Sequence, residues 1–388
     1  MMKLNYRSIW FLLVLIAIIG NGCNDAFIPD LPSSNKNNLV VEGMINTGAG
    51  ETKITLSRVT SLSSLLTLTN VPELNAKVQV EGADNSVKLL TEQGNGVYAA
   101  TLTGMAANGQ YRLRITTSSN KVYLSDFTNA LVTPAVDDLS WKREASGVQI
   151  GVKTKAPQTA SKYYKWEYDE IYEYTSVAVS DYKYIKAEKR VAQRTANEQI
   201  YRCYRSKHSP DILLGSTAAL TENTISNFPI RLIPNNSQLL TVKYYIALKQ
   251  YSINADANRF FTQMKKNTEL TGSIFDQQPS EAQGNIHNLN DVSEIVIGYI
   301  TASTVEEKKI FITNSQVPGW SYAYPSQCSI TILVNNTIPD FEQYFTTSYV
   351  PLVPVLSATN TILGYTSYYS ECLDCTAAGG TTTKPSFW

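Results

Sequence analysis

Between residues 39 and 133, apolar and polar residues alternate in short runs that are separated by turn residues. In one run, for example, Val78 and Val80 share one parity while Lys77 and Gln79 take the other. A period of two is typical of strands with one buried and one solvated face, as in antiparallel sheets. About seven such runs predict an immunoglobulin-like β-sandwich over residues 39–133.

Pro134 interrupts this pattern, and a second β-rich series extends over residues 134–388. Strands are expected near residues 240–248, 295–300, 310–312 and 330–334. Between the first two, a helix near residues 255–266 is expected, with Asn254 as N-cap and one apolar stripe: Ala257, Phe260, Phe261 and Met264. The fold class is therefore mainly β, with the first sandwich followed by a larger sandwich-type domain that has one or two helical insertions.

One expected strand of the second series, residues 163–174, has an almost wholly aromatic face. Charged residues occupy most of its odd positions, and its even positions include five rings: Tyr164, Trp166, Tyr168, Tyr172 and Tyr174. Such a face either packs in the core of a sandwich or forms a flat platform on which a sugar or peptide stacks. Both interpretations stay open at this point, and burial of the rings would exclude the platform.

The N-terminus begins with a different pattern. Lys3 and Arg7 precede eleven consecutive apolar residues, 9–19, and small residues then lead to Cys23. Eleven residues reach about 16 Å as a helix, roughly half the thickness of a bilayer core, so a membrane span is not expected. The pattern predicts a lipoprotein signal peptide over residues 1–22.

If so, the mature chain begins at Cys23, which carries acyl chains and anchors the protein to membrane lipid. Residues 23–38 are rich in Pro, Ser and Asn, which predicts a flexible tether. An ordinary secretory signal is the alternative, because Gly20 stands where a typical lipobox has a large apolar residue.

Composition narrows the classes of function. The chain has 33 basic and 33 acidic residues, so no large positive field exists to attract nucleic acid. Tyrosine occurs 24 times and histidine only twice. The many tyrosines favour β-structure and solvated binding surfaces, whereas the scarcity of histidine removes the most common general base.

Four cysteines remain after Cys23 is set aside, and an even number in an exported protein favours disulfides. Four cysteines allow three connectivities, and they include a closely spaced pair: Cys203, Cys328, Cys372 and Cys375. A zinc site is the alternative, because the spacing of the last two resembles that of zinc ligands. We expect disulfides that pin a C-terminal tail, and we expect Phe387 and Trp388 to dock against the second domain.

No catalytic signature is present in the sequence. We find no nucleophile elbow, phosphate-binding loop, zinc-protease motif or dinucleotide fingerprint. Neighbouring acidic residues such as Asp169 and Glu170 point to opposite sides of a strand, and we interpret them as solvated. His208 is likewise interpreted as a solvated residue. The expected protein is therefore not an enzyme and has no cofactor and no metal, although carboxylates from distant strands could still form a glycosidase site.

Several stretches, taken in order, resemble the family called domain of unknown function 4249 (DUF4249). They are the runs 39–43 (LVVEG), 165–168 (KWEY), 275–280 (FDQQPS), 284–286 (GNI) and the ending from Cys372 through 379–388 (GGTTTKPSFW). The resemblance implies an exported lipoprotein of Gram-negative bacteria, associated with TonB-dependent receptors of the outer membrane. It implies no activity.

These observations predict an accessory or binding protein anchored in the outer membrane by the lipid on Cys23. Its expected partners are membrane lipid, a TonB-dependent receptor and a small ligand, but not nucleic acid. An enzyme that processes surface glycans or peptides, and a structural component of the cell envelope, are the alternatives.

Overall fold

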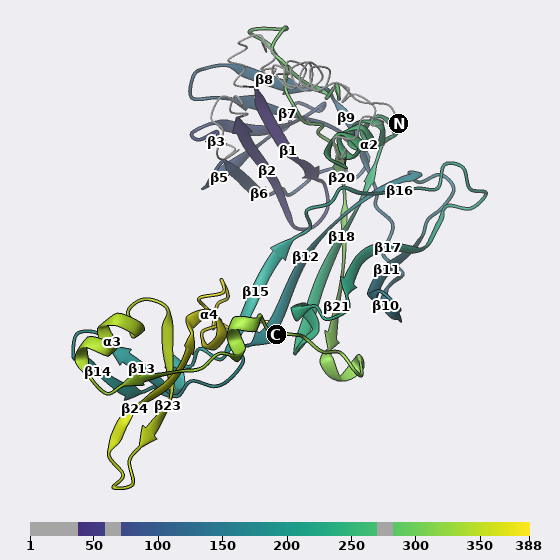
Figure 1. The fold of residues 1–388 in the computed structure, drawn as a ribbon. Helices are drawn as coiled ribbons and strands as arrows, with labels where there is room; N and C mark the ends of the chain where they lie inside the picture. The colour runs from purple at the N-terminus through teal and green to yellow at the C-terminus, as the bar shows by residue number, and fades with distance from the viewer. Residues whose placement is uncertain (1–37, 59–70, 270–281) are drawn as a thin grey trace, which may run out of the picture.

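The computed structural model describes residues 38–58, 71–269 and 282–388. The predicted signal peptide, the predicted acylation site Cys23, the run 275–280 and nearly all of the predicted tether lie outside these residues. The protein is mainly β, with 48% strand and 12% helix, which confirms the predicted class. In Figure 1 the molecule is elongated, with one group of strands at the top, long strands in the middle and a small module at the lower end.

Eleven strands form the first sheet, whose order closes on itself because β9 pairs with both β20 and β7. Its interior is one apolar cluster that includes Leu39, Ile54 and Leu113, whose parity in the sequence predicts burial. The strands are β1 (Leu39–Asn46), β2 (Glu51–Arg58), β3 (Val71–Pro72), β4 (Lys77–Gly82), β5 (Val87–Gly94), β6 (Val97–Thr101), β7 (Gln110–Thr116), β8 (Val122–Ser125), β9 (Thr128–Leu131), β19 (Ile286–Asn288) and β20 (Ala302–Ser303).

Two of these strands return from the second half of the chain, so the predicted boundary at residue 133 leaves out part of the first domain. β20 lies parallel between β1 and β9. Before it, the Val41 N–H donates to the carbonyl oxygen of Ile297 at 2.8 Å, and residues 295–300 form only an isolated bridge rather than the expected strand. The returning segment satisfies backbone groups of β1 that would otherwise be unpaired.

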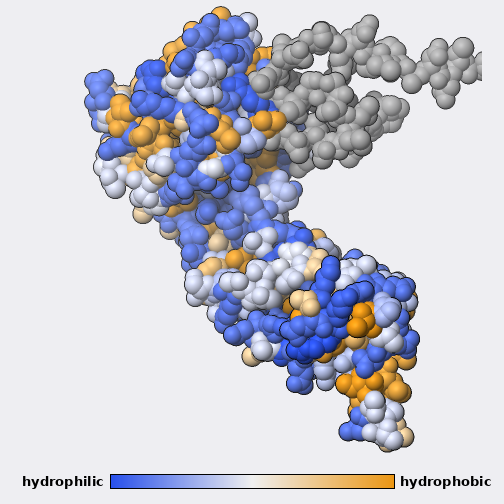
Figure 2. Space-filling view, turned by 90° about the vertical axis from the view of Figure 1, so that its left-hand side faces the viewer, coloured by the Kyte–Doolittle hydropathy of each residue, from blue (hydrophilic) through white to orange (hydrophobic). Residues whose placement is uncertain are grey.

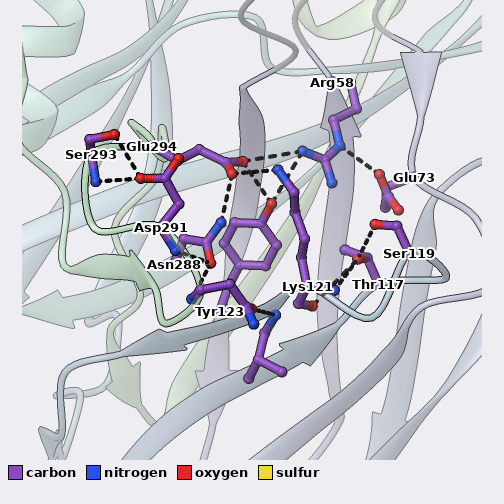
Figure 3. A network of polar contacts seen from close by, with 12 residues as sticks. Arg58, Glu73, Thr117, Ser119, Lys121, Tyr123, Asn288, Asp291, Ser293 and Glu294 are labelled. Carbon is purple, nitrogen blue, oxygen red and sulfur yellow. Dashed lines mark hydrogen bonds and ion pairs between the residues drawn. The ribbon is translucent and has the colours of Figure 1, made fainter.

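A cluster of polar side chains holds the returning segment in place (Figure 3). Glu294 accepts hydrogen bonds from Lys121 Nζ at 2.7 Å, from the Tyr123 hydroxyl at 2.7 Å and from Asn288 Nδ2 at 2.6 Å. Burial acts to raise the pKa of Glu294, but these donors outweigh it and hold the pKa below its ordinary value. An ionised carboxylate therefore ties residues 288–294 to the first sheet.

The middle of the molecule consists of two packed sheets with one shared apolar cluster. The longer sheet has the order β15-β12-β18-β21, with β16 also pairing with β12, and the shorter sheet has the order β10-β11-β17. Their strands are β10 (Asp138–Glu144), β11 (Gly147–Lys155), β12 (Tyr163–Thr175), β15 (Arg202–His208), β16 (Leu213–Ser216), β17 (Thr224–Pro234), β18 (Lys243–Ile253) and β21 (Val305–Thr313).

The predicted helix is α2 (Ala255–Glu269), which continues three residues beyond the expected end. Asn254 caps it as predicted, because its Oδ1 accepts a hydrogen bond from the Ala257 N–H at 2.7 Å. The described part of the chain also contains four short 3-10 helices, at Ala196–Glu198, Gln238–Leu240, Asn314–Gln316 and Ser326–Ser329.

A small module lies at the far end of the molecule, with its own apolar cluster around Val334, Phe341 and Tyr365. Apolar side chains are exposed on its sheet and hairpin, among them Leu333 and Leu363, and Figure 2 shows an orange patch at this end. The module contains β13 (Tyr182–Ile185), β14 (Arg190–Gln193), β22 (Ile332–Asn335), α3 (Ile338–Phe345), β23 (Tyr349–Leu356), β24 (Ile362–Tyr369) and α4 (Ser370–Leu373).

Two disulfides join this end of the chain to the rest. Cys203 pairs with Cys375, and Cys328 pairs with Cys372, which settles the connectivity and excludes the zinc alternative for these thiols. Gly380 packs beside the first disulfide, where a Cβ atom would lie only 2.7 Å from the Cβ of Cys203. The second glycine of the GG motif near the C-terminus therefore has a packing role.

The two C-terminal aromatic residues dock on the long sheet, as predicted. The Trp388 indole N–H donates to Glu173 Oε2 at 2.7 Å, and its ring lies 5.6 Å from the ring of Phe311. The Phe387 ring lies 4.7 Å from that of Tyr245. The end of the chain thus covers the lower part of this sheet face.

Candidate functional site

The aromatic face predicted as a possible ligand platform is buried. Its five rings are at most 3% exposed, and they face the shorter sheet, where Phe228 stacks on Trp166 with 4.6 Å between ring centroids: Tyr164, Trp166, Tyr168, Tyr172 and Tyr174. Polar groups of the rings also find partners inside: the Trp166 indole N–H donates to Gln250 Oε1 at 2.8 Å, and the Tyr174 hydroxyl donates to the carbonyl oxygen of Cys375 at 2.7 Å. The platform interpretation is therefore wrong, and the face is core.

Glu170 is the polar exception on this buried face. It is only 3% exposed, its Oε2 accepts a hydrogen bond from the Tyr244 hydroxyl at 2.7 Å, and the Arg231 Nε lies 3.1 Å away. Interpreting Glu170 as a solvated carboxylate was wrong, because the even parity that places it among the rings also buries it. A paired internal carboxylate of this kind keeps its partners in place.

The opposite face of β12 lines a cavity of about 580 Å³ between the first domain and the long sheet. Directly paired residues of neighbouring strands lie on the same face of a sheet. Each set of paired residues in β12, β18 and β21 therefore forms a row across the cavity face, and the rows contain charges of both signs. Row by row, these residues are Lys165, Tyr251 and Val305, and then Glu167, Lys249 and Glu307. We call this surface the sheet wall of the interdomain cavity, together with Asp169, His208, Ile253 and, from α2, Phe261.

The facing surface belongs to β1 and β2, and we call it the first-domain wall. Glu42 pairs with Thr55 across these strands, and Met44 pairs with Lys53. The wall comprises these four residues and Glu51, and its three charged side chains are exposed toward the cavity. Residues more than 100 positions apart in the sequence thus enclose one space.

Two ion-paired groups organise the sheet wall. Glu167 accepts from Lys165 Nζ at 2.5 Å through one oxygen and from the Tyr251 hydroxyl at 3.0 Å through the other. Asp169 contacts Lys249 Nζ at 3.2 Å and His208 Nδ1 at 2.8 Å. Each carboxylate therefore has a cation or a donor on both oxygens, which fixes its orientation.

These contacts control the ionisation of both carboxyl groups. Burial acts to raise the pKa of Glu167, but the charge of Lys165 and the Tyr251 hydroxyl outweigh it, so the pKa is lowered. The pKa of Asp169 is lowered in the same way, against burial, by the contacts with His208 and Lys249. Both groups are negatively charged at neutral pH.

A hydrogen-bonded junction sets the position of the sheet wall relative to the first domain. The Thr133 hydroxyl donates to the carbonyl oxygen of Thr304 at 2.5 Å and accepts from the Ser252 N–H at 3.0 Å. Gln250 Nε2 donates to the carbonyl oxygen of Pro134 at 2.8 Å. Even-numbered residues of β18 thus bind the interdomain linker while odd-numbered neighbours line the cavity, and the cavity is pre-formed.

Other candidate chemistry is sparse in the described part of the chain. Within residues 38–58, 71–269 and 282–388, no three His, Cys, Asp or Glu side chains gather as ligands for a metal ion. None of the described helices combines the length and apolar character needed to cross a bilayer.

β12 was predicted to carry a possible site on its aromatic face, but it lines the cavity with its opposite, charged face. The charged residues at odd positions of β12 can be read from the sequence. A single sequence does not indicate which distant segment faces them. The cavity depends on the first-domain wall, and only the run 39–43, which contains Glu42, belonged to a motif.

The model of the family described as "Domain of unknown function (DUF4249)" matches residues 24–309. This is well over half of the chain, and it includes both walls of the cavity. The protein therefore belongs to the DUF4249 family.

No curated protein matches this chain. Among solved structures, a DUF4785 family protein from Legionella pneumophila aligns with 11% identity and a TM-score of 0.16, over 55% of this chain and 51% of that one. This chain thus spans about half the length of the Legionella protein.

Two further alignments are similarly weak. The alpha chain of the chicken interferon gamma receptor gives 12% identity and a TM-score of 0.14, over 54% of this chain and 87% of that one. A mutant of Salmonella alpha-2-macroglobulin aligns with 11% identity and a TM-score of 0.18, over 84% of this chain and 16% of that one. Similarity at this level carries no argument about fold or function.

Proposed function

We propose that this protein is a non-catalytic binding protein that takes a small polar ligand between its first domain and its long sheet. The observation that carries the proposal is the interdomain cavity. Its volume of about 580 Å³ lies within the range of small-molecule sites, and its walls combine charged groups with a few apolar side chains. The junction at Thr133 supports a pre-formed site, which lowers the cost of binding.

The electrostatics of the cavity favour binding over hydrolysis. A glycosidase needs one carboxyl group whose pKa is raised so that it can act as a general acid. Glu167 and Asp169, the two carboxylates at the centre of the sheet wall, have lowered pKa values instead. They stay ionised and are therefore not suited to protonate a ligand.

The proposal includes the location expected from the sequence. A lipid anchor on Cys23 would hold the protein at the outer membrane, where a TonB-dependent receptor in the same membrane would meet it at a high effective concentration. The resemblance of the first domain to immunoglobulin-like sandwiches is also part of the proposal, supported by its short antiparallel strands and single apolar core.

Filling the cavity tests the binding function. Met44→Trp places a large side chain on the first-domain wall, and Val87→Trp, at a 54% exposed position of β5 that does not line the cavity, is the matched control. Native mass spectrometry of protein purified from cell envelopes would show a bound small molecule in the wild type and the control, and its loss in Met44→Trp. An equal bound fraction in all three proteins would contradict the proposal.

The anchor has its own test. Cys23→Ala removes the thiol that would be acylated, so the protein is expected to leave the membrane fraction for the soluble fraction. Cys23→Ala protein that stays on the membrane would show that the attachment has another cause.

A further inference from the structure

We infer that the ligand of the interdomain cavity is a zwitterion with a peptide-like backbone, in which an ammonium group and a carboxylate are about two residues apart. This inference rests on the proposed function, since it names the ligand class for the same cavity. It is carried by a contrast between the two walls of the cavity.

The first-domain wall has uncompensated charges of both signs. Glu42, Glu51 and Lys53 all line the cavity and are exposed, and none of the three makes an ion pair with another residue in the described ranges. A ligand with only one sign of charge would leave part of this wall without a partner. A zwitterion satisfies both.

The spacing of these charges fits a short peptide. Glu51 and Lys53 are two positions apart on β2 and share a face, which places their Cα atoms about 7 Å apart. Two residues of extended peptide also span about 7 Å, so the ammonium and carboxylate of a dipeptide can reach both side chains at once.

The sheet wall offers a different kind of contact. Its lysines are already neutralised, because Lys165 pairs with Glu167 and Lys249 pairs with Asp169. Beside these pairs, the half-buried side chains of Phe261 and Val305 offer apolar surface to the side chains of a ligand, whereas Tyr251 and Ile253 line the cavity but are only 7% and 1% exposed. One wall thus recognises charge while the other provides apolar area.

Titration calorimetry with four forms of one dipeptide tests the inference. The probes are Ala-Leu with free termini, its N-acetylated form, its C-amidated form and the doubly blocked form. The proteins are the wild type, Lys53→Met and the control Lys77→Met, which removes an exposed lysine of β4 that does not line the cavity.

Blocking either terminus should weaken binding about fivefold, the effect of one partly exposed ion pair. Lys53→Met should weaken binding of the free dipeptide by the same factor, because the ligand carboxylate loses its partner. The same variant should bind the C-amidated form as well as the wild type does. Lys77→Met should bind all four forms like the wild type.

Three results would overturn the inference: no binding of the free dipeptide, equal binding of the doubly blocked form, or equal behaviour of the two lysine variants. If Met44→Trp still loses an envelope-derived ligand in that case, the binding function stands and only the ligand class is wrong. If neither experiment detects a ligand, the proposed binding function and the inferred ligand class are both wrong.

Discussion

The two faces of β12 differ sharply in burial and in charge. On the even face, Trp166 is 0% exposed and packs against the second sheet of the central sandwich. On the odd face, Asp169 has a side chain that is 47% exposed and lines a cavity. The same strand therefore supplies stability from one side and lines the proposed binding cavity from the other.

This comparison shows that aromatic content alone is a poor guide to a binding surface. Rings that could stack on a ligand stack on each other when a second sheet is available, because burial of apolar area is favourable. The surface left open to the cavity is the one whose charges make burial costly.

Removing a ring from the buried face should have the largest effect. Trp166→Ala leaves a cavity and deprives buried Gln250 of a hydrogen-bond donor, so the free energy of unfolding should fall by about 3–5 kcal/mol. Glu167→Gln, on the other face of the same strand, should change it by less than about 1 kcal/mol. Denaturant unfolding of both variants measures the contrast, and similar losses would contradict the assignment of the two faces.

Removing the end of the chain should have an intermediate effect. Without residues 379–388, the part of the odd face that Trp388 and Phe387 cover becomes solvated, and the melting temperature should fall by several degrees. Replacement of Lys384 alone by Ala is the control, because that residue is exposed and is not one of the two docked aromatic residues. An unchanged melting temperature after the deletion would show that the docked residues add no stability.

Acid should produce the smallest effect, and it should come from the odd face. The folded-state pKa values of Glu167 and Asp169 lie below their ordinary values, so these groups stabilise the fold above the carboxyl range near pH 4. Their contribution is lost as the pH falls through the lowered values. The loss from pH 5 to pH 2 should be smaller in a variant with Glu167→Gln and Asp169→Asn. A wild-type protein with the same pH dependence as this variant would contradict the assignment.

Much of the fold could be predicted from local pattern. Val78 and Leu113 show by parity that they are buried, Asn254 and its apolar stripe identify α2, and an even set of four cysteines in a chain predicted to be exported indicates disulfides. Each of these features depends on residues close in the sequence or on a small set of possible pairings.

What could not be predicted depends on distant segments. β20 pairs with β1 across more than 250 residues, and neither strand contains a signal for the other. The cavity has the same origin, because Lys53 and Glu167 come to line one space only after two domains have formed. Glu170 shows that prediction can also fail within a single strand, because its charge predicts exposure while its position among the rings buries it.

Carboxylate footprinting most directly tests the claim that the odd face of β12 is the ligand-binding face. Carbodiimide-driven labelling with glycine ethyl ester, followed by mass spectrometry, reports the accessibility of each carboxyl group with and without a small-molecule extract of the cell envelope. We expect Asp169, Glu42 and Glu51 to be labelled in the free protein and protected by the extract, and Glu170 to stay unlabelled throughout. Labelling of Glu170, or cavity carboxylates that the extract leaves equally reactive, would contradict the account.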